Sequence, residues 1–262
     1  MITIAIANHK GGVGKTTIAV NIAAGLSRFL PKKELLLVDL DPQANATAHF
    51  MNPQKLKKSI ANLFDAEFYN QRDLIYPTRI PNLKIIPSNI KLGAKELIAA
   101  SLLEPHRRIE RYLKTVATDF SVIILDTPPS LGFFSMNALM ATQYVLIPVN
   151  PEKLALDGLP DILKQITITQ QVNPDLRVLA IIPTAVDRRY RVHKEILNDL
   201  RQHFIPLFRE DWGINTNAPL KDASARRLTI YEYDSNCTAY RQFLSLSQNI
   251  VKTLNLNGDS NA

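Results

Sequence analysis

The stretch that decides the fold lies near the start of the 262-residue chain and reads His9-Lys10-Gly11-Gly12-Val13-Gly14-Lys15-Thr16-Thr17. It follows the apolar run Ile2–Ala7, which predicts a buried strand, and it opens the helical pattern Thr16–Phe29. Its glycines let the backbone turn tightly and direct successive N–H groups inward. A glycine-rich turn between a strand and a helix therefore predicts a phosphate-binding loop.

The residues at the end of this loop have the chemistry that such a site needs. Lys15 can reach the β- and γ-phosphates of a nucleotide, and the Thr16 hydroxyl can ligate Mg²⁺. Thr17 is placed for the α-phosphate, and the helix N-terminus adds a partial positive charge. A glycine-rich turn that binds nothing is the alternative, but Gly14-Lys15-Thr16 stands in register after a strand, which favours binding.

Apolar runs and amphipathic stretches alternate along most of the chain. The runs lack the polar alternation of half-exposed strands, so they predict parallel strands that are covered on both faces. These runs are Ile2–Ala7, Leu35–Leu40, Leu83–Ile86, Val122–Leu125, Tyr144–Val149 and Val178–Ile182. The helical patterns are Thr16–Phe29, Lys91–Leu103, Pro105–Ala117, Leu131–Met140, Arg191–Phe204 and Ala239–Leu254. The order predicts an α/β fold, a doubly wound and mostly parallel sheet with helices on both faces.

Composition bounds the class of protein. Hydrophobic residues make up 46% and charged residues 21% of the chain, as in a soluble protein with a core. No apolar run approaches the roughly 20 residues that span a bilayer, and we expect a cytoplasmic protein. The single cysteine, Cys237, excludes an internal disulfide framework and a metal site built from several thiolates of one chain. We expect one domain over residues 1–254 and a polar C-terminal tail without fixed structure over residues 255–262.

Acidic residues stand at the ends of two predicted strands. Asp39 and Asp41 end the segment Leu36-Leu37-Val38-Asp39-Leu40-Asp41-Pro42-Gln43, and Asp126 ends Val122-Ile123-Ile124-Leu125-Asp126. Ligands of open α/β sheets bind at the carboxyl ends of the strands. The three carboxylates are therefore expected near the phosphate-binding loop.

Lys10 is an additional lysine that an ordinary phosphate-binding loop does not require. With it, the loop resembles the deviant Walker A box of the ParA/MinD family of P-loop ATPases. The segment Asp39-Leu40-Asp41-Pro42-Gln43 and the segment Asp126-Thr127-Pro128-Pro129 are similar to two further family boxes. Residues 82–88, 148–152 and 154–158 also look like family segments, so the resemblance covers most of residues 1–245.

This resemblance implies the P-loop NTPase fold, with ATP and Mg²⁺ as ligands. It implies that Lys10 crosses a dimer interface to the nucleotide of the partner and that Asp41 positions or activates the attacking water. Lys10, Lys15 and Asp41 are thus the expected catalytic residues, and Thr16, Asp39 and Asp126 are expected at the metal. The nucleotide is expected to contact Lys10, Gly11, Gly12, Val13, Gly14, Lys15, Thr16, Thr17 and Asn217. In the same loop, Asn215 stands where relatives often have proline.

Within the family, the resemblance is greatest to ParA-type partition ATPases. These form homodimers with ATP, bind DNA without sequence preference, and are stimulated by a cargo adaptor protein. The basic residues expected at DNA are Arg188, Arg189, Lys221, Arg226 and Arg227, and the net charge of +7 permits a polyanion partner. We therefore expect a slow ATPase that associates with the nucleoid and not with the membrane.

Two alternatives remain open on the sequence. A MinD-type regulator would need a membrane-binding amphipathic helix at its end. Here the last helical pattern, Ala239–Leu254, has only Arg241 and Lys252 as cations and is typical of a helix packed with its apolar side inward. A metabolic P-loop enzyme would need a further substrate pocket, and no additional acid/base group of residues indicates one.

Overall fold

The computed structural model describes residues 1–65, 71–99, 102, 104–152 and 155–257. The strands are β1 Ile2–Ile6, β2 Leu35–Asp39, β3 Tyr76–Pro77, β4 Leu83–Ile86, β5 Val122–Asp126, β6 Tyr144–Val149, β7 Arg177–Val186 and β8 Ile214–Asn215. The α-helices are α1 Lys15–Phe29, α2 Asn45–Ala48, α3 Lys91–Ala99, α4 Arg108–Thr115, α5 Phe133–Met140, α6 Ala155–Gln170, α7 Arg191–His203, α8 Ala218–Ala225, α9 Ile230–Tyr233 and α10 Thr238–Thr253. Short 3-10 helices are η1 Pro53–Lys55, η2 Ile60–Phe64, η3 Gln71–Leu74, η4 Pro105–Arg107 and η5 Glu210–Trp212.

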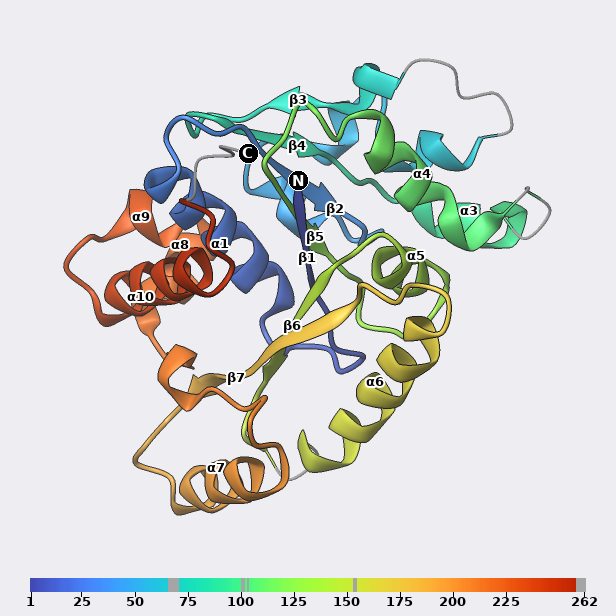
Figure 1. Ribbon diagram of the computed structural model, residues 1–262. Helices are drawn as coiled ribbons and strands as arrows, with labels where there is room; N and C mark the ends of the chain where they lie inside the picture. The colour runs from blue at the N-terminus through green and yellow to red at the C-terminus, as the bar shows by residue number, and fades with distance from the viewer. Residues whose placement is uncertain (66–70, 100–101, 103, 153–154, 258–262) are drawn as a thin grey trace.

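The strands form one sheet in the order β3-β4-β2-β5-β1-β6-β7-β8. Every pair is parallel except β3 with β4, so the expected mostly parallel sheet is confirmed. β1 lies between β5 and β6, and the phosphate-binding loop leaves its carboxyl end (Figure 1). In the register of β2 and β5, Asp39 lies opposite Asp126, which brings two of the predicted acids together.

Both faces of the sheet are covered, which explains why the strands read as continuous apolar runs. Leu35 and Leu37 of β2 belong to the core beneath α1 and α10, while Leu36 and Val38 belong to the core beneath α3, α4 and α5. A third core joins β6 and β7 to α6 and α7. Alternate side chains point to opposite faces of a strand, so each strand contributes to two cores. Figure 1 shows α1 and α8–α10 on one side of the sheet and α3–α6 on the other.

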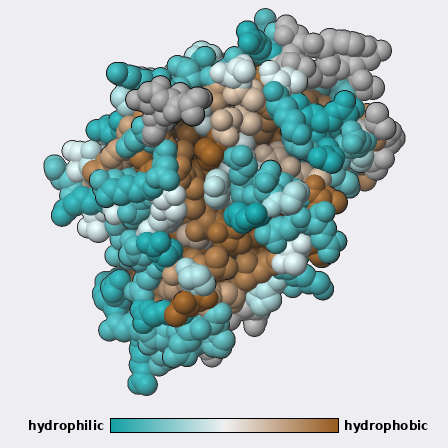
Figure 2. Space-filling view, viewed as in Figure 1, coloured by the Kyte–Doolittle hydropathy of each residue, from teal (hydrophilic) through white to brown (hydrophobic). Residues whose placement is uncertain are grey.

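The last helix packs inward, as its sequence predicts. Phe243, Leu246 and Ile250 of α10 are fully buried in the core shared with α1. The two helices approach closely at Gly25, where a Cβ atom would lie 2.1 Å from Ser247 Oγ. The hydropathy view shows mainly hydrophilic side chains over the outer surface in this region (Figure 2). Within the described residues, none of the helices has the length and apolar character that a bilayer-spanning helix needs.

Several predicted boundaries differ from the observed ones. The pattern 91–103 gives α3 only as far as Ala99, and residues 100, 101 and 103 lie outside the described residues. The pattern 105–117 begins as a 3-10 turn and continues as α4 to Thr115. β7 extends four residues beyond its predicted end, Ile182, to Val186, because its last residues pair with β8. α6 is not among the predicted helices, and it contains Pro160.

The first residues of the predicted polar tail close the end of α10. Asn255 takes the left-handed conformation (φ 50°), so that the Leu256 N–H donates to the carbonyl of Val251 and closes the end of α10. Leu256 is 6% exposed, and its carbonyl accepts a hydrogen bond from Lys33 Nζ at 2.6 Å. Residues 258–262 lie outside the described residues.

Candidate functional site: a phosphate-binding loop, three buried acids and an adjoining pocket

The phosphate-binding loop takes the conformation that its glycines permit. Gly12 and Gly14 have φ angles of 75° and 85°, in the left-handed region that side chains disfavour. The loop is fastened by Asn8, whose Nδ2 donates to the Pro148 carbonyl at 2.8 Å and whose Oδ1 accepts from Lys10 N at 3.0 Å. Asn8 was not identified in the sequence analysis, although its position directly before the loop is visible in the sequence.

Lys15 is 7% exposed and lies inside the loop. Its Nζ donates to the Lys10 carbonyl at 2.9 Å. Burial lowers the pKa of Lys15, and the negative charges of Asp126 and Asp41 act in the opposite direction. The loop, Lys15 and these two acids therefore meet in one site, as the sequence predicts.

Asp126 ends β5 and is fully buried. Neither of its carboxylate oxygens has a hydrogen-bond partner of good geometry among the described residues, although the Thr16 hydroxyl lies close enough to interact with it. Burial, and then the charge of Asp39, raises the pKa of Asp126 well above its ordinary value, while the Thr16 side chain and Lys15 act to lower it. A buried carboxylate without a partner is costly, so this site fits a cation or its bound water.

The described residues contain no group of three or more His, Cys, Asp and Glu side chains that could hold a metal by themselves. Mg²⁺ typically keeps several waters and is bound by one or two protein groups together with substrate phosphates. The Thr16 hydroxyl and, through water, Asp126 are the residues that would hold it here. The donor set therefore fits Mg²⁺ that arrives with a nucleotide.

Asp39 is also fully buried, but its oxygens already have partners. Oδ1 accepts from Asp41 N at 3.1 Å, and Oδ2 accepts from the Thr47 N–H at 2.8 Å and the Thr47 hydroxyl at 2.7 Å. Burial raises the pKa of Asp39 to about 6, although these hydrogen bonds act to lower it. These contacts indicate that Asp39 positions the turn that carries Asp41, and its place at the metal stays a prediction. Sequence reasoning missed Thr47.

Asp41 follows β2 and is 7% exposed. Its Oδ1 accepts from Gln43 N at 2.9 Å, which fixes the turn Asp41-Pro42-Gln43. The charge of Asp41 acts on Lys15 and on Asp126, so its carboxylate lies near both of these residues. That location is compatible with the predicted role in positioning a water.

Lys10 forms an ion pair within its own chain. Its Nζ lies 3.0 Å from Glu152 Oε2, and the two side chains are 26% and 56% exposed. Asn150 Nδ2 donates to the other oxygen of Glu152 at 2.8 Å. The segment Asn150-Pro151-Glu152, identified from sequence only as similar to the family, thus holds the lysine in the isolated subunit.

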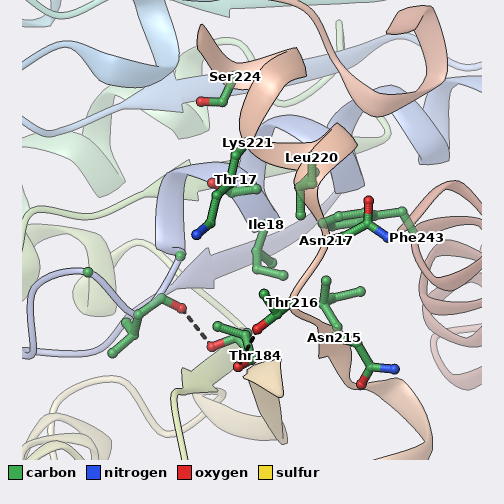
Figure 3. A pocket seen from close by; sticks show the side chains of 15 residues that line it. Thr17, Ile18, Thr184, Asn215, Thr216, Asn217, Leu220, Lys221, Ser224 and Phe243 are labelled. Atoms are coloured by element: carbon green, nitrogen blue, oxygen red, sulfur yellow. Dashed lines mark hydrogen bonds between the residues drawn. The ribbon is translucent and has the colours of Figure 1, made fainter. Parts of the chain in front are cut away.

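A pocket of about 380 Å³ adjoins the loop (Figure 3). Its lining residues come from the loop, the start of α1, the end of β7, β8, α8 and α10. They are Gly12, Val13, Gly14, Thr17, Ile18, Thr184, Ala185, Ile214, Asn215, Thr216, Asn217, Leu220, Lys221, Ser224 and Phe243. Thr184 Oγ1 donates to the Val13 carbonyl at 2.9 Å, which joins the end of β7 to the loop.

Asn217 lines this pocket, as expected for a residue that contacts the base. Its Oδ1 is buried and has no hydrogen-bond partner among the described residues. An acceptor without a partner suits the exocyclic amino group of adenine, which is a donor. Asn215 lines the pocket as well, at the position where relatives often have proline.

The basic residues expected at DNA differ in their contacts. Arg188 pairs with Glu210 at 3.3 Å, and Arg189 pairs with Asp187 at 2.6 Å. The Arg226 guanidinium lies 5.6 Å from the centre of the Tyr233 ring.

Arg227 lines a separate pocket of about 310 Å³ together with Thr16 and Thr17. Lys221 lies in the wall of the larger pocket beside the loop. Lys221 and Arg227 thus line neighbouring pockets, which share Thr17 and Ser224.

Known proteins resemble the chain over nearly its whole length. A family model described as an AAA domain matches residues 1–178. The sporulation initiation inhibitor protein Soj of Bacillus subtilis is 33% identical over 252 residues, which are 95% of this chain and 97% of that protein. The chromosome partitioning protein ParA of Myxococcus xanthus is 32% identical over 253 residues, 95% of this chain and 87% of that protein.

Among solved structures, cobyrinic acid a,c-diamide synthase from Mycobacterium smegmatis with a bound ATP analogue and magnesium has a TM-score of 0.84 at 27% identity. That similarity covers 98% of this chain and 97% of the synthase. Together with the loop, Lys10 and the three acids, these similarities settle the relationship. The chain belongs to this AAA-domain family and, within it, to the ParA/MinD family of P-loop ATPases with a deviant Walker A loop.

Proposed function

We propose that this protein is a ParA-like ATPase that partitions or positions DNA or another large cargo. MgATP holds two copies together as a homodimer, the dimer binds DNA without sequence preference, and hydrolysis resets the switch. The observation that carries the proposal is Lys10. It is a second lysine in the loop, and in its own chain its side chain pairs with Glu152, while Lys15 lies inside the loop. The relative ParA, which is named a chromosome partitioning protein, supports the same assignment.

The contact that holds Lys10 is weak enough to be exchanged. Its only ion pair among the described residues is with the half-exposed Glu152. Pairs this exposed contribute at most about 1 kcal/mol. Lys10 can therefore leave Glu152 and reach the phosphates of a partner subunit, where a cation stabilises charge on the transferring phosphoryl group. Hydrolysis then depends on dimerisation.

The remaining roles follow from the site. Lys15 binds the β- and γ-phosphates from within the loop, and Asp41 orients the attacking water or accepts its proton at the carboxylate. Mg²⁺, when bound, neutralises charge on the phosphates. Asp126 and Thr16 would orient that ion and its waters. Asp39 holds the Asp41 turn by accepting from the Asp41 N–H, and Thr47 in turn holds Asp39.

DNA binding would use exposed arginines, whose ion pairs do not prevent it. The Arg188 and Arg189 side chains are 67% and 86% exposed, although each pairs with an acid. Exchange of such surface partners for DNA phosphates costs little, and dimerisation doubles the number of arginines available. Arg226 and Arg227 are exposed as well. A cargo adaptor that accelerates hydrolysis, and a location on the nucleoid in the cytoplasm, complete the proposal.

The proposal is tested by DNA retention with ATP, with ADP and without nucleotide, each in the presence of Mg²⁺. Retention with ATP alone that falls steeply with salt is expected. Equal retention in all three states would rule out control of DNA binding by the nucleotide. No retention at low salt would rule out DNA binding itself.

The similarity to the diamide synthase favours one second candidate, a metabolic enzyme that uses ATP to form amides. Light scattering separates the two functions, because only the switch requires ATP-dependent dimerisation. A MinD-type regulator is disfavoured because α10 buries its apolar side in the core. Pelleting with DNA and with anionic liposomes distinguishes that alternative.

A further inference from the structure

One face of α8 forms a wall of the nucleotide pocket. Asn217, Leu220, Lys221 and Ser224 all line the pocket, at spacings of three and four residues that place them on the same side of a helix. Asn217 is the N-cap residue of this helix. The phosphate-binding loop and Thr17 form the opposite wall.

Lys221 points across this pocket. In Figure 3 its side chain runs from α8 past Thr17, with the amine on the side of the phosphate-binding loop. It is the only charged side chain among the lining residues, all of which belong to the described part of the chain. No ion pair observed among the described residues includes it. The pocket therefore contains a cation without a counter-ion.

A nucleotide would supply that counter-ion. Lys15 and Lys10 stand at the other end of the loop, where the β- and γ-phosphates are expected, and Asn217 stands where the base is expected. The phosphate between these two ends is the α-phosphate, for which Thr17 is placed. Lys221 shares the pocket with Thr17 and approaches it from the opposite wall.

We propose that Lys221 is a nucleotide-binding residue whose ammonium group pairs with the phosphate next to the ribose. The inference rests on the proposed nucleotide site and adds a cation to it from α8. It also replaces the sequence-based assignment of Lys221 to DNA, while Arg226 and Arg227, beyond the end of the same helix, keep theirs. Lys221 is solvent-exposed, so its substitution leaves the core intact.

The test measures the affinities of ATP, ADP and AMP by competition against a fluorescent ADP, in the wild type, Lys221→Ala and Lys221→Arg. Lys194→Ala is the matched control, because Lys194 is an exposed lysine on α7 that lines none of the pockets described here. A charge-assisted contact to a phosphate predicts that Lys221→Ala weakens all three nucleotides by the same factor, about tenfold or more. Lys221→Arg should restore most of the affinity, and Lys194→Ala should match the wild type.

The outcomes are separable. If the wild type binds no nucleotide, the proposed function fails. If the wild type binds but Lys221→Ala binds equally well, only the Lys221 inference is overturned. A loss confined to ATP would place the lysine at the γ-phosphate and also contradict the inference.

A second readout separates the nucleotide role from a DNA role. At saturating MgATP, Lys221→Ala should retain DNA with an unchanged dependence on salt, whereas Arg226→Ala should weaken retention. If Lys221→Ala instead lowers the salt slope by about 1, the lysine contacts a DNA phosphate and the assignment is wrong.

Discussion

Replacement of Asp126 by asparagine should stabilise the nucleotide-free protein and abolish its response to Mg²⁺. Asp126 is fully buried, its oxygens accept no hydrogen bond of good geometry among the described residues, and it lies opposite Asp39 in the β2–β5 pair. The asparagine side chain would keep the shape of the aspartate and remove its charge. Its amide could also donate to the Asp39 carboxylate, which has capacity for further hydrogen bonds.

The magnitude follows from the buried, unpaired acceptor. Such a group costs about 1–3 kcal/mol, more when it is charged. The direction in which the unfolding free energy changes with pH follows from proton linkage. The pKa of Asp126 is raised by burial and by Asp39, so the folded state binds more protons than the unfolded state. The resulting destabilisation is absent below the unfolded pKa of 3.8 and grows as pH rises towards the folded pKa. Asp126→Asn should therefore exceed the wild type in unfolding free energy by about 1–3 kcal/mol at high pH.

Asp39 provides an internal reference for this experiment. Its pKa rises from 3.8 to about 6 on folding. A rise of about 2 units corresponds to roughly 3 kcal/mol of stability lost between about pH 4 and pH 6. That part of the pH dependence should remain in Asp126→Asn, because burial is the main cause of the raised pKa of Asp39.

The assay is urea unfolding from pH 4 to pH 9, with and without Mg²⁺ and a non-hydrolysable ATP analogue. The difference between variant and wild type should grow with pH, and the stabilisation that Mg²⁺ adds to the analogue should disappear in the variant. A variant that is less stable than the wild type at high pH, or that keeps the full effect of Mg²⁺, would refute the assignment of a metal-linked acid.

Three further substitutions test the loop and the acid beside it. Lys15→Ala should lose productive nucleotide binding, because the phosphates lose a buried point charge; unchanged affinity in a calorimetric titration would contradict this role. Asp41→Ala should bind ATP and dimerise but release phosphate slowly, and a normal rate would show that another group positions the water. Gly14→Ala should weaken nucleotide binding and lower the unfolding free energy by about 1–2 kcal/mol, because φ is 85° there; chemical denaturation measures the second effect, and a stability equal to that of the wild type would contradict it.

The predictable part of the fold is the part that local pattern controls. Six apolar runs became strands of a parallel sheet because both faces of those strands are buried, and their sequences show it. The loop was predictable because Gly12 and Gly14 occupy left-handed positions. The proximity of Asp126 and Asp39 was predictable because both residues end parallel strands. The observed register places them opposite each other.

The unpredicted part depends on contacts between segments far apart in sequence. The ion pair between Lys10 and Glu152 joins residues 142 positions apart, and nothing local indicates it. Thr47 binds one carboxylate oxygen of Asp39 only because the chain turns back after Asp41. Lys221 stands near the arginines in sequence, yet the direction of α8 turns it into the pocket. Leu256 packs under α10 because Asn255 closes that helix, although its neighbours are polar.

The central claim is that MgATP joins two copies of this chain through Lys10, and light scattering of Asp41→Ala with MgATP tests it most directly. The account predicts that the molar mass rises from 29.4 kDa to twice that value. It also predicts that the rise is lost when Lys10→Ala is added, while ATP remains bound. A mass that stays at 29.4 kDa with ATP bound, or a dimer that forms without Lys10, would contradict it.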